Sequence, residues 1–186
     1  MKPVGDMSLG QLAGYVCSHL GRNGIRVVLS GGAAVSIHSG SRYQSFDLDF
    51  VENVPSGRER LREVLKEIGF IEKAWYFVHS ETEFFLDFPA GPLAVGREPV
   101  KDIEEMDFPT GKLNILSPTE CVKDRLAAYY HWSDRQSLHQ ALLVAKCKPI
   151  NLKEIARWSR VVGKGDEFEV VRESLLEAAR RGKQAD

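Results

Sequence analysis

Cysteine is scarce in this chain, and its placement argues against a disulfide scaffold or a thiolate metal site. Cys17, Cys121 and Cys147 are odd in number and widely spaced, and none of them has the spacing of a metal-binding Cys or His pair. A chain of 186 residues can bury roughly 70% of its unfolded surface without covalent staples. We therefore expect a reduced, cytoplasmic protein.

Long apolar runs and a surplus of charge of one sign are also missing. No segment approaches the roughly 20 apolar residues of a membrane span, and the N-terminal region lacks the pattern of a signal peptide. We thus expect no membrane partner. The 25 basic and 26 acidic residues give a formal net charge of −1, so any contact with RNA would be a local patch.

Hydrophobic periodicity separates a mixed α/β part of the chain from a helical part. The patterns predict helices at 8–21, 33–40, 56–70, 117–132, 133–147, 151–163 and 167–180, and strands at 25–30, 46–50, 73–80, 82–91 and 112–117. Ser56 and Glu59 have the spacing of a capping box, as do Ser117 and Glu120. We predict an α/β (α+β) fold, with a mixed β-sheet core flanked by helices over residues 1–116 and an all-helical part over residues 117–186.

Asp47 and Asp49 stand two residues apart in an otherwise apolar segment. In an extended strand both side chains leave the same face, while Phe46, Leu48 and Phe50 occupy the other. Two adjacent carboxylates repel each other unless one is protonated or a cation lies between them. Their hard oxygen ligands suit Mg²⁺ or Mn²⁺. The alternative is a solvent-facing edge strand on which both carboxylates are hydrated.

Ser30, Gly31 and Gly32 lie between a predicted strand and a predicted helix. Bare backbone N–H groups at the start of a helix, together with the helix dipole, bind phosphate oxygens. The alternative is a tight turn that needs a positive φ. A phosphate-binding turn followed about fifteen residues later by two carboxylates suits a nucleoside triphosphate and its metal.

A third carboxylate, Asp87, lies among aromatic and apolar residues in the predicted strand 82–91. We expect it to bind metal and to help deprotonate the hydroxyl of an acceptor. The alternative is a hydrogen-bonded Asp at the end of a strand, shortly before Pro89.

These motifs resemble the nucleotidyltransferase superfamily that shares its palm with DNA polymerase beta. The Gly-Gly turn, the DLD strand and the later carboxylate carry this likeness. More narrowly, SGGAA, SFDLDF, SPTECVKDRLAAYY and WSDRQSLHQAL are similar to bacterial minimal nucleotidyltransferase-like proteins, including abortive-infection toxins, over roughly residues 27–144. The resemblance implies that nucleotide and metal are held by Gly31, Gly32, Asp47, Asp49 and Asp87.

The toxin-like relatives imply further roles for Ser45, Lys123 and Asp134. Lys123 is expected to neutralise triphosphate charge, and Arg42 is a second candidate, although either can be an ordinary surface cation. Ser45 is open to the alternative of a turn or capping hydroxyl. The sequence departs from those relatives at RYQS, where the Arg is farther from the first Asp, and at SDRQ, which replaces their KD pair.

The sequence thus predicts a metal-dependent nucleotidyltransferase that moves a nucleoside monophosphate from an NTP to a hydroxyl, with Mg²⁺ or Mn²⁺ as cofactor. The acceptor is open among a tRNA 3′ end, a protein hydroxyl and a small molecule such as an aminoglycoside. The resemblance also allows a toxin with a small antitoxin partner. The alternatives are a catalytically silent nucleotide-binding or partner-binding protein on the same fold, and a structural protein whose Asp pair is surface.

Overall fold

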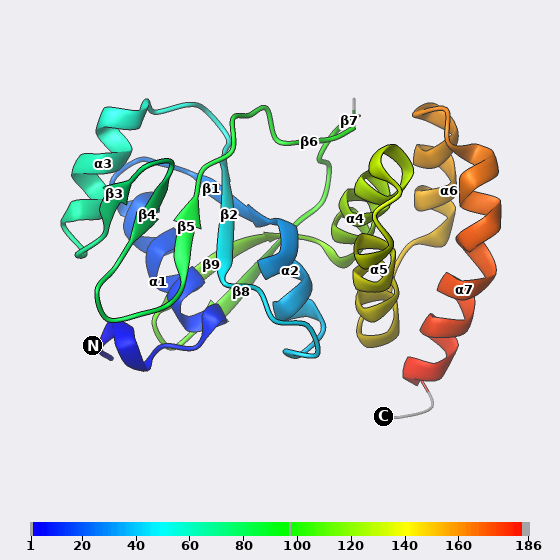
Figure 1. Ribbon diagram of the computed structural model, residues 1–186, viewed down its shortest axis with the longest axis horizontal. Coiled ribbons are helices and arrows are strands. Elements are labelled where there is room, and N and C mark those ends of the chain that lie inside the picture. Colours follow the sequence, from blue (N-terminus) through cyan, green and yellow to red (C-terminus); the bar gives the residue numbers. More distant parts are fainter. Residues whose placement is uncertain (1, 97, 184–186) are drawn as a thin grey trace. The chain divides into compact units, whose positions relative to one another are not determined.

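The computed structural model describes residues 2–96 and 98–183 (Figure 1). The described residues group into two compact units. The sheet unit comprises the segments 1–33, 45–93 and 103–115, and the helical unit comprises 34–44, 94–102 and 116–186. The chain passes between the units several times, and one of these points lies at residue 116, where the sequence predicts a domain boundary.

A seven-stranded mixed sheet, in the order β3-β4-β5-β2-β1-β9-β8, confirms the predicted fold class. Its strands are β1 (Val27–Ser30), β2 (Asp47–Glu52), β3 (Ile71–Lys73), β4 (Tyr76–Val78), β5 (Phe85–Asp87), β8 (Ile103–Phe108) and β9 (Gly111–Leu116). β2 is central, since it pairs antiparallel with β1 and parallel with β5. β4 and β5, from the two predicted strands 73–80 and 82–91, pair antiparallel.

Helices α1 (Leu9–Arg22) and α3 (Arg58–Lys66) belong to the sheet unit, after a short 3₁₀ helix at Val4–Asp6. They contact each other through His19, whose Nε2 lies 3.0 Å from the carbonyl oxygen of Val64. The guanidinium of Arg58 lies 4.5 Å from the centroid of the Phe77 ring. Phe77 lies opposite Leu86 in the sheet and is fully buried, so α3 covers the apolar face of these strands.

The start of α3 differs from the sequence prediction. Its N-cap is Gly57, at φ +91°, and no side chain caps the helix, so the capping box expected at Ser56 and Glu59 is wrong. The carboxylate of Glu52 accepts a hydrogen bond from the backbone N–H of Ser56 at 2.8 Å. Ser56 is therefore held by the preceding strand, and glycine makes the turn into the helix.

The helical unit contains α4 (Pro118–Trp132), α5 (Arg135–Cys147), α6 (Leu152–Val161) and α7 (Gly165–Lys183). α4 packs against α5 and α6, and α7 packs against the same two helices (Figure 1). Ser117 caps α4 by accepting the N–H of Glu120, as predicted. In the described part of the chain, no helix has the length and apolar character that crossing a membrane requires.

A short strand pair and one further helix complete the fold. Strands β6 (Ala94–Val95) and β7 (Glu98–Pro99) pair antiparallel within the helical unit. The buried Trp158 of α6 donates its Nε1–H to the carbonyl oxygen of Val95 at 3.2 Å. Helix α2 (Gly31–His38) follows β1 directly, because it begins at the residue after Ser30.

Candidate active site

Three neighbouring strands bring the predicted site residues of the sheet unit into one row. Ser30 of β1 lies opposite Asp49 of β2, and Asp49 lies opposite Asp87 of β5. Residues opposite each other on paired strands point to the same face of a sheet. Asp47 shares that face because it is two residues from Asp49. The three carboxylates therefore project from one face, which confirms the common face predicted for Asp47 and Asp49 and adds Asp87 to it, while their functional roles stay predictions.

The opposite face of the same strands is apolar and fixes this arrangement. Leu48, Phe50 and Leu86 are each 0% exposed. Sliding β2 by one residue would bury its two carboxylates and expose Leu48 and Phe50. The half-buried positions of Asp47 and Asp49 are therefore the consequence of packing behind them.

The turn between β1 and α2 brings the backbone against Asp49. Gly31 has φ +64°, a left-handed conformation that glycine adopts readily. A Cβ on Gly31 would lie 1.9 Å from Oδ2 of Asp49, so this carboxylate occupies the space that a side chain would take. The first N–H groups of a helix have no intrahelical acceptor, and they attract anions. The backbone N–H groups at the start of α2, which can bind an anion, therefore lie beside the Asp49 carboxylate.

Asp47 and Asp87 are hydrogen-bonded to donors close to them in the chain. The hydroxyl of Ser45, which is 6% exposed, donates to Oδ1 of Asp47. The backbone N–H of Phe88 donates to Oδ1 of Asp87 at 2.8 Å. The buried Ser45 hydroxyl thus fixes the orientation of the Asp47 carboxylate.

Asp47, Asp49 and Asp87 carry oxygen atoms that can bind a metal ion, but these oxygens do not converge on one point. Among the described residues, no group of three or more His, Cys, Asp and Glu side chains is placed so that it could hold a metal ion. Carboxylate oxygens are nevertheless the donors that Mg²⁺ and Mn²⁺ prefer. Asp47 and Asp87 each already have one oxygen, Oδ1, in a hydrogen bond, so a cation bound with these bonds in place would use the other oxygen of each carboxylate.

Tyr76 joins the carboxylate row, although the sequence analysis did not assign it. The pairing of Phe77 with Leu86, continued by one residue, places Tyr76 opposite Asp87. Its ring is 42% exposed and meets that of Phe85 edge-on, with 5.0 Å between the centroids. The alternation of side chains along the predicted strand 73–80 is the signal that could have identified it.

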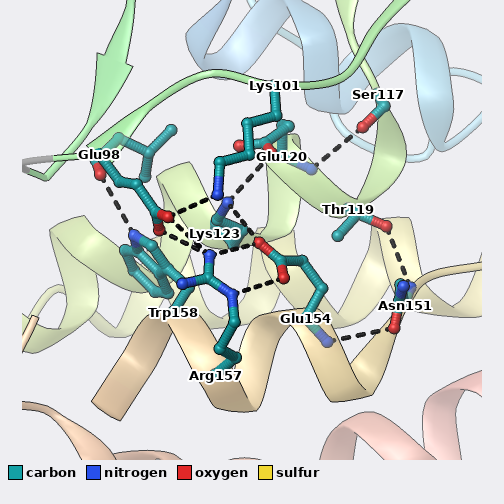
Figure 2. Close-up of polar contacts among 11 residues, drawn as sticks. Glu98, Lys101, Ser117, Thr119, Glu120, Lys123, Asn151, Glu154, Arg157 and Trp158 are labelled. Atoms are coloured by element: carbon teal, nitrogen blue, oxygen red, sulfur yellow. Dashed lines mark hydrogen bonds and ion pairs between the residues drawn. The ribbon is translucent and has the colours of Figure 1, made fainter. Parts of the chain in front are cut away.

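Lys123, a predicted nucleotide ligand, is buried in the helical unit (Figure 2). Its side chain is 1% exposed, and its Nζ lies 3.0 Å from Oε1 of Glu120 and 3.5 Å from Oε1 of Glu154. Glu120 is buried as well, and its Oε2 has no hydrogen-bond partner among the described residues. Two carboxylates already compensate the Lys123 charge, so a contact with phosphate would require breaking these ion pairs.

The ion pairs around Lys123 continue to the segment that contains β7 (Figure 2). Arg157 Nη2 lies 2.6 Å from Oε1 of Glu154 and 2.7 Å from Oε1 of Glu98. Lys101 Nζ lies 2.8 Å from the same oxygen of Glu98. Hydrogen bonds from Arg157 and Lys101 lower the pKa of Glu98 to about 2. Alternating charges thus link Glu98 and Lys101 to helices α6 and α4.

Arg42 and Asp134, the other predicted nucleotide ligands, have local partners in the helical unit. Arg42 Nη1 lies 3.3 Å from the carbonyl oxygen of Ser39 and 2.8 Å from Sγ of Cys147. Asp134 is the N-cap of α5 and accepts the N–H of Gln136 at 2.9 Å. The capping bond explains the Asp at this position without a nucleotide. Arg42, Lys123 and Asp134 thus belong to the helical unit, whereas the other seven predicted site residues belong to the sheet unit.

Comparison with solved structures identifies the fold. An antigenic nucleotidyltransferase-like protein from Paracoccidioides brasiliensis matches with a TM-score of 0.62 and 14% identity, over 90% of this chain and 91% of that one. The antibiotic-resistance factor ANT(2″)-Ia matches with a TM-score of 0.52 and 12% identity, over 89% and 95%. No protein-family model and no curated protein matches the chain. The chain therefore has the nucleotidyltransferase fold that its motifs resemble.

Replacement of Gly31 by alanine should cost more stability than the same change at Gly40. Their φ values are +64° and +62°, so the strain of a left-handed alanine is common to both variants. Only the Cβ at Gly31 meets another residue, since nothing lies within 4 Å of the one at Gly40. In urea denaturation, Gly31→Ala should lose about 1–3 kcal/mol more than Gly40→Ala. Equal losses would contradict the contact with Asp49.

Replacement of Lys123 by methionine should lower the free energy of unfolding by about 3–5 kcal/mol, because the Glu120 carboxylate stays buried without its cation. Lys123→Met combined with Glu120→Gln removes both charges and should recover much of this loss. The control is Lys112→Met, which removes an exposed ion pair with Glu105 and should cost about 1 kcal/mol or less. Chemical denaturation measures all three, and similar losses for Lys123→Met and Lys112→Met would argue against the buried pair.

Proposed function

We propose that this chain is a metal-dependent nucleotidyltransferase, which moves a nucleoside monophosphate from an NTP to a hydroxyl. The observation that carries the proposal is the row formed by Asp49 and Asp87 beside the turn at Gly31. The fold, which the chain has in common with two nucleotidyltransferase-type structures, supports the same class of reaction.

The start of α2 would bind the phosphates of the NTP. Its first N–H groups, at Gly31 and Gly32, follow Ser30 directly, and the dipole of the helix favours negative charge at this end. The absence of a Cβ at Gly32 lets phosphate oxygens approach the backbone closely, whereas the Cβ position of Gly31 is taken by the Asp49 carboxylate. Ser30 is held in the row by a hydrogen bond from its hydroxyl to the carbonyl oxygen of Asp49, at 3.3 Å.

Asp47 and Asp49 would hold the divalent cation, with Asp87 as a third oxygen ligand from the neighbouring strand. When bound, Mg²⁺ or Mn²⁺ neutralises phosphate charge and stabilises the pyrophosphate that leaves. The Ser45 hydroxyl on Asp47 would keep that carboxylate oriented before the cation binds. Each ligand comes from a strand rather than a loop, so the row is held by the packing of the sheet.

Asp87 would accept the proton of the acceptor hydroxyl. As that proton leaves, the hydroxyl oxygen bonds to the α-phosphorus, and the bond from this phosphorus to the bridging oxygen of the β-phosphate breaks. The products are the nucleotidylated acceptor and pyrophosphate. Oδ1 of Asp87 accepts the N–H of Phe88, which leaves Oδ2 to take the proton.

A small-molecule hydroxyl is the first acceptor to test, because the similar structure of ANT(2″)-Ia belongs to an antibiotic-resistance factor. A tRNA end and a protein hydroxyl are the other two acceptors that the motifs allow. A toxin with a small antitoxin partner is a narrower form of the proposal. A small reading frame next to the gene, whose product binds this protein and inhibits labelling, would support that form.

A catalytically silent nucleotide-binding protein is the second candidate. The observation that favours it is the lack of a three-ligand group among the described residues, since Asp47 and Asp87 are engaged by Ser45 and Phe88. Such a protein would bind NTP with a divalent cation and transfer nothing.

Replacement of Asp49 by asparagine keeps the shape of the side chain and removes its charge. Labelling of an acceptor from NTP and Mg²⁺ or Mn²⁺ should fall by about 100-fold or more, because the cation loses an anionic ligand. Thermal stabilisation by Mg²⁺ and NTP should shrink together with the affinity for them. The matched control is Asp107→Asn, a change at an exposed Asp on a strand of the same sheet.

The four NTPs are offered with pools of aminoglycosides, total RNA and cell protein as acceptors. Wild-type protein that is stabilised by Mg²⁺ and NTP through Asp49, yet labels no pool, is the result expected of the silent binder. Absence of both labelling and stabilisation in the wild type would contradict both candidates. Equal labelling by Asp49→Asn and Asp107→Asn would contradict the assignment of the row.

A further inference from the structure

The helical unit contains a cavity that the proposed function does not use. It has a volume of about 380 Å³ and lies between the end of α5, the loop that leads to α6 and the last turns of α7. Small-molecule sites in proteins span roughly 300–1,000 Å³, so this cavity is large enough for a small ligand. All of its lining residues belong to the helical unit.

The cavity combines an apolar wall with basic side chains. The apolar wall comes from Pro149, Ile150, Leu152, Leu176 and Ala179. Lys146, Lys148 and Arg180 also line it, and none of these three has an ion-pair partner among the described residues. The wall suits the body of an organic molecule, and the cations suit an anionic group attached to it.

The helix ends at the cavity do not account for all of this positive charge. The C-terminus of a helix carries roughly half a negative charge, and it attracts a cation in its last turn. Two such ends, those of α5 and α7, offset roughly one of the three positive charges. Among the described residues, a surplus of roughly two positive charges therefore remains in the lining of the cavity.

The two helices that form the cavity are packed closely at its edge. A Cβ at Gly182 of α7 would lie 1.8 Å from the carbonyl oxygen of Lys146 in α5. The backbones therefore approach each other to a distance that only glycine permits. This contact fixes the position of α7 on α5 at the edge of the cavity.

We propose that this cavity binds a small organic anion, with its phosphate or carboxylate group at Lys148 and Arg180 and its apolar body against Ile150 and Leu176. The guanidinium of Arg180 matches the planar, two-oxygen geometry of either head group. The site is independent of nucleotidyl transfer, so its test neither needs nor affects the proposed activity.

Cys147 is a lining residue of the cavity and is half-buried, and its Sγ lies 2.8 Å from Nη1 of Arg42, beside the cavity wall, so its reactivity serves as a reporter of that wall. The other two cysteines, Cys17 and Cys121, are buried. Burial also raises the pKa of both thiols, which leaves little of the reactive thiolate at neutral pH. Iodoacetamide should therefore modify Cys147 first, and a ligand in the cavity should slow that reaction.

The experiment follows alkylation of the full chain by intact mass with four probes that each contain eight carbon atoms in one unbranched chain. Octyl phosphate and octanoate carry an anionic head, octylamine a cationic one and octanol a neutral one, all used below their micellar concentrations. The two anions should slow alkylation of Cys147 in a saturable manner, and the other two probes should leave it unchanged. The anion that protects Cys147 at the lower concentration shows whether the cavity prefers a phosphate or a carboxylate head group.

Charge and volume of the cavity are then changed separately. Arg180→Glu and Lys148→Glu should each weaken protection by octyl phosphate about 10-fold or more, the loss expected for one charge-assisted contact. Arg172→Glu, on the same helix but outside the cavity, should leave protection unchanged. Ala179→Phe fills the apolar part and should abolish protection by both anions. Circular dichroism confirms that each variant is folded, and a variant that unfolds is replaced by the other charge reversal.

Three results would overturn the proposal. Equal protection by all four probes would show an apolar cavity without charge selection. No protection of Cys147 together with no thermal stabilisation of the chain by octyl phosphate or octanoate would show that the cavity does not take organic anions. Undiminished protection in both charge reversals would show that the anions bind elsewhere.

Discussion

The buried apolar face of β2 determines where its acidic residues lie. Full burial of Leu48 and Phe50 stabilises the folded state by about 3–6 kcal/mol in total. The carboxylates of Asp47 and Asp49, about 7 Å apart along the strand, repel each other by about 2 kcal/mol at an effective dielectric constant of 20. Burial is the larger effect, so the strand forms with two like charges on its other face. That residual repulsion is the reason why a cation should bind there.

The neighbours of β2 turn this local pair into a possible active site. Pairing with β1 brings the start of α2 to Asp49, and pairing with β5 adds Asp87. Gly31, at the start of α2, is required for two reasons. Its φ is positive, and the Asp49 carboxylate lies where the Cβ of another residue would be. Hydrogen bonds from Ser45 and Phe88 hold Oδ1 of the other two carboxylates and so orient their second oxygens, at which a cation would bind.

The sequence predicted those parts of the fold that depend on local patterns. Alternation around Asp47 and Asp49, and the Ser117 cap of α4, follow from residues a few positions apart. Strand β8 was not predicted, because three of its six residues are acidic and it forms only by pairing at the edge of the sheet. The burial of Lys123 depends on Glu154, which lies on another helix. Contacts between residues far apart in the chain cannot be predicted from the spacing of residues within one motif. Such contacts decide whether a lysine binds a ligand or a neighbouring carboxylate.

A crystal grown with Mn²⁺ and a non-hydrolysable NTP analogue tests the carboxylate row most directly. The anomalous signal of manganese should lie at Asp47 and Asp49, next to Asp87, and phosphate oxygens should contact the N–H groups at the start of α2. A crystal of Asp49→Asn grown in the same way should lose most of the signal. Manganese at another place in the chain, or an undiminished signal in the variant, would contradict the proposal that these carboxylates bind the metal and the nucleotide.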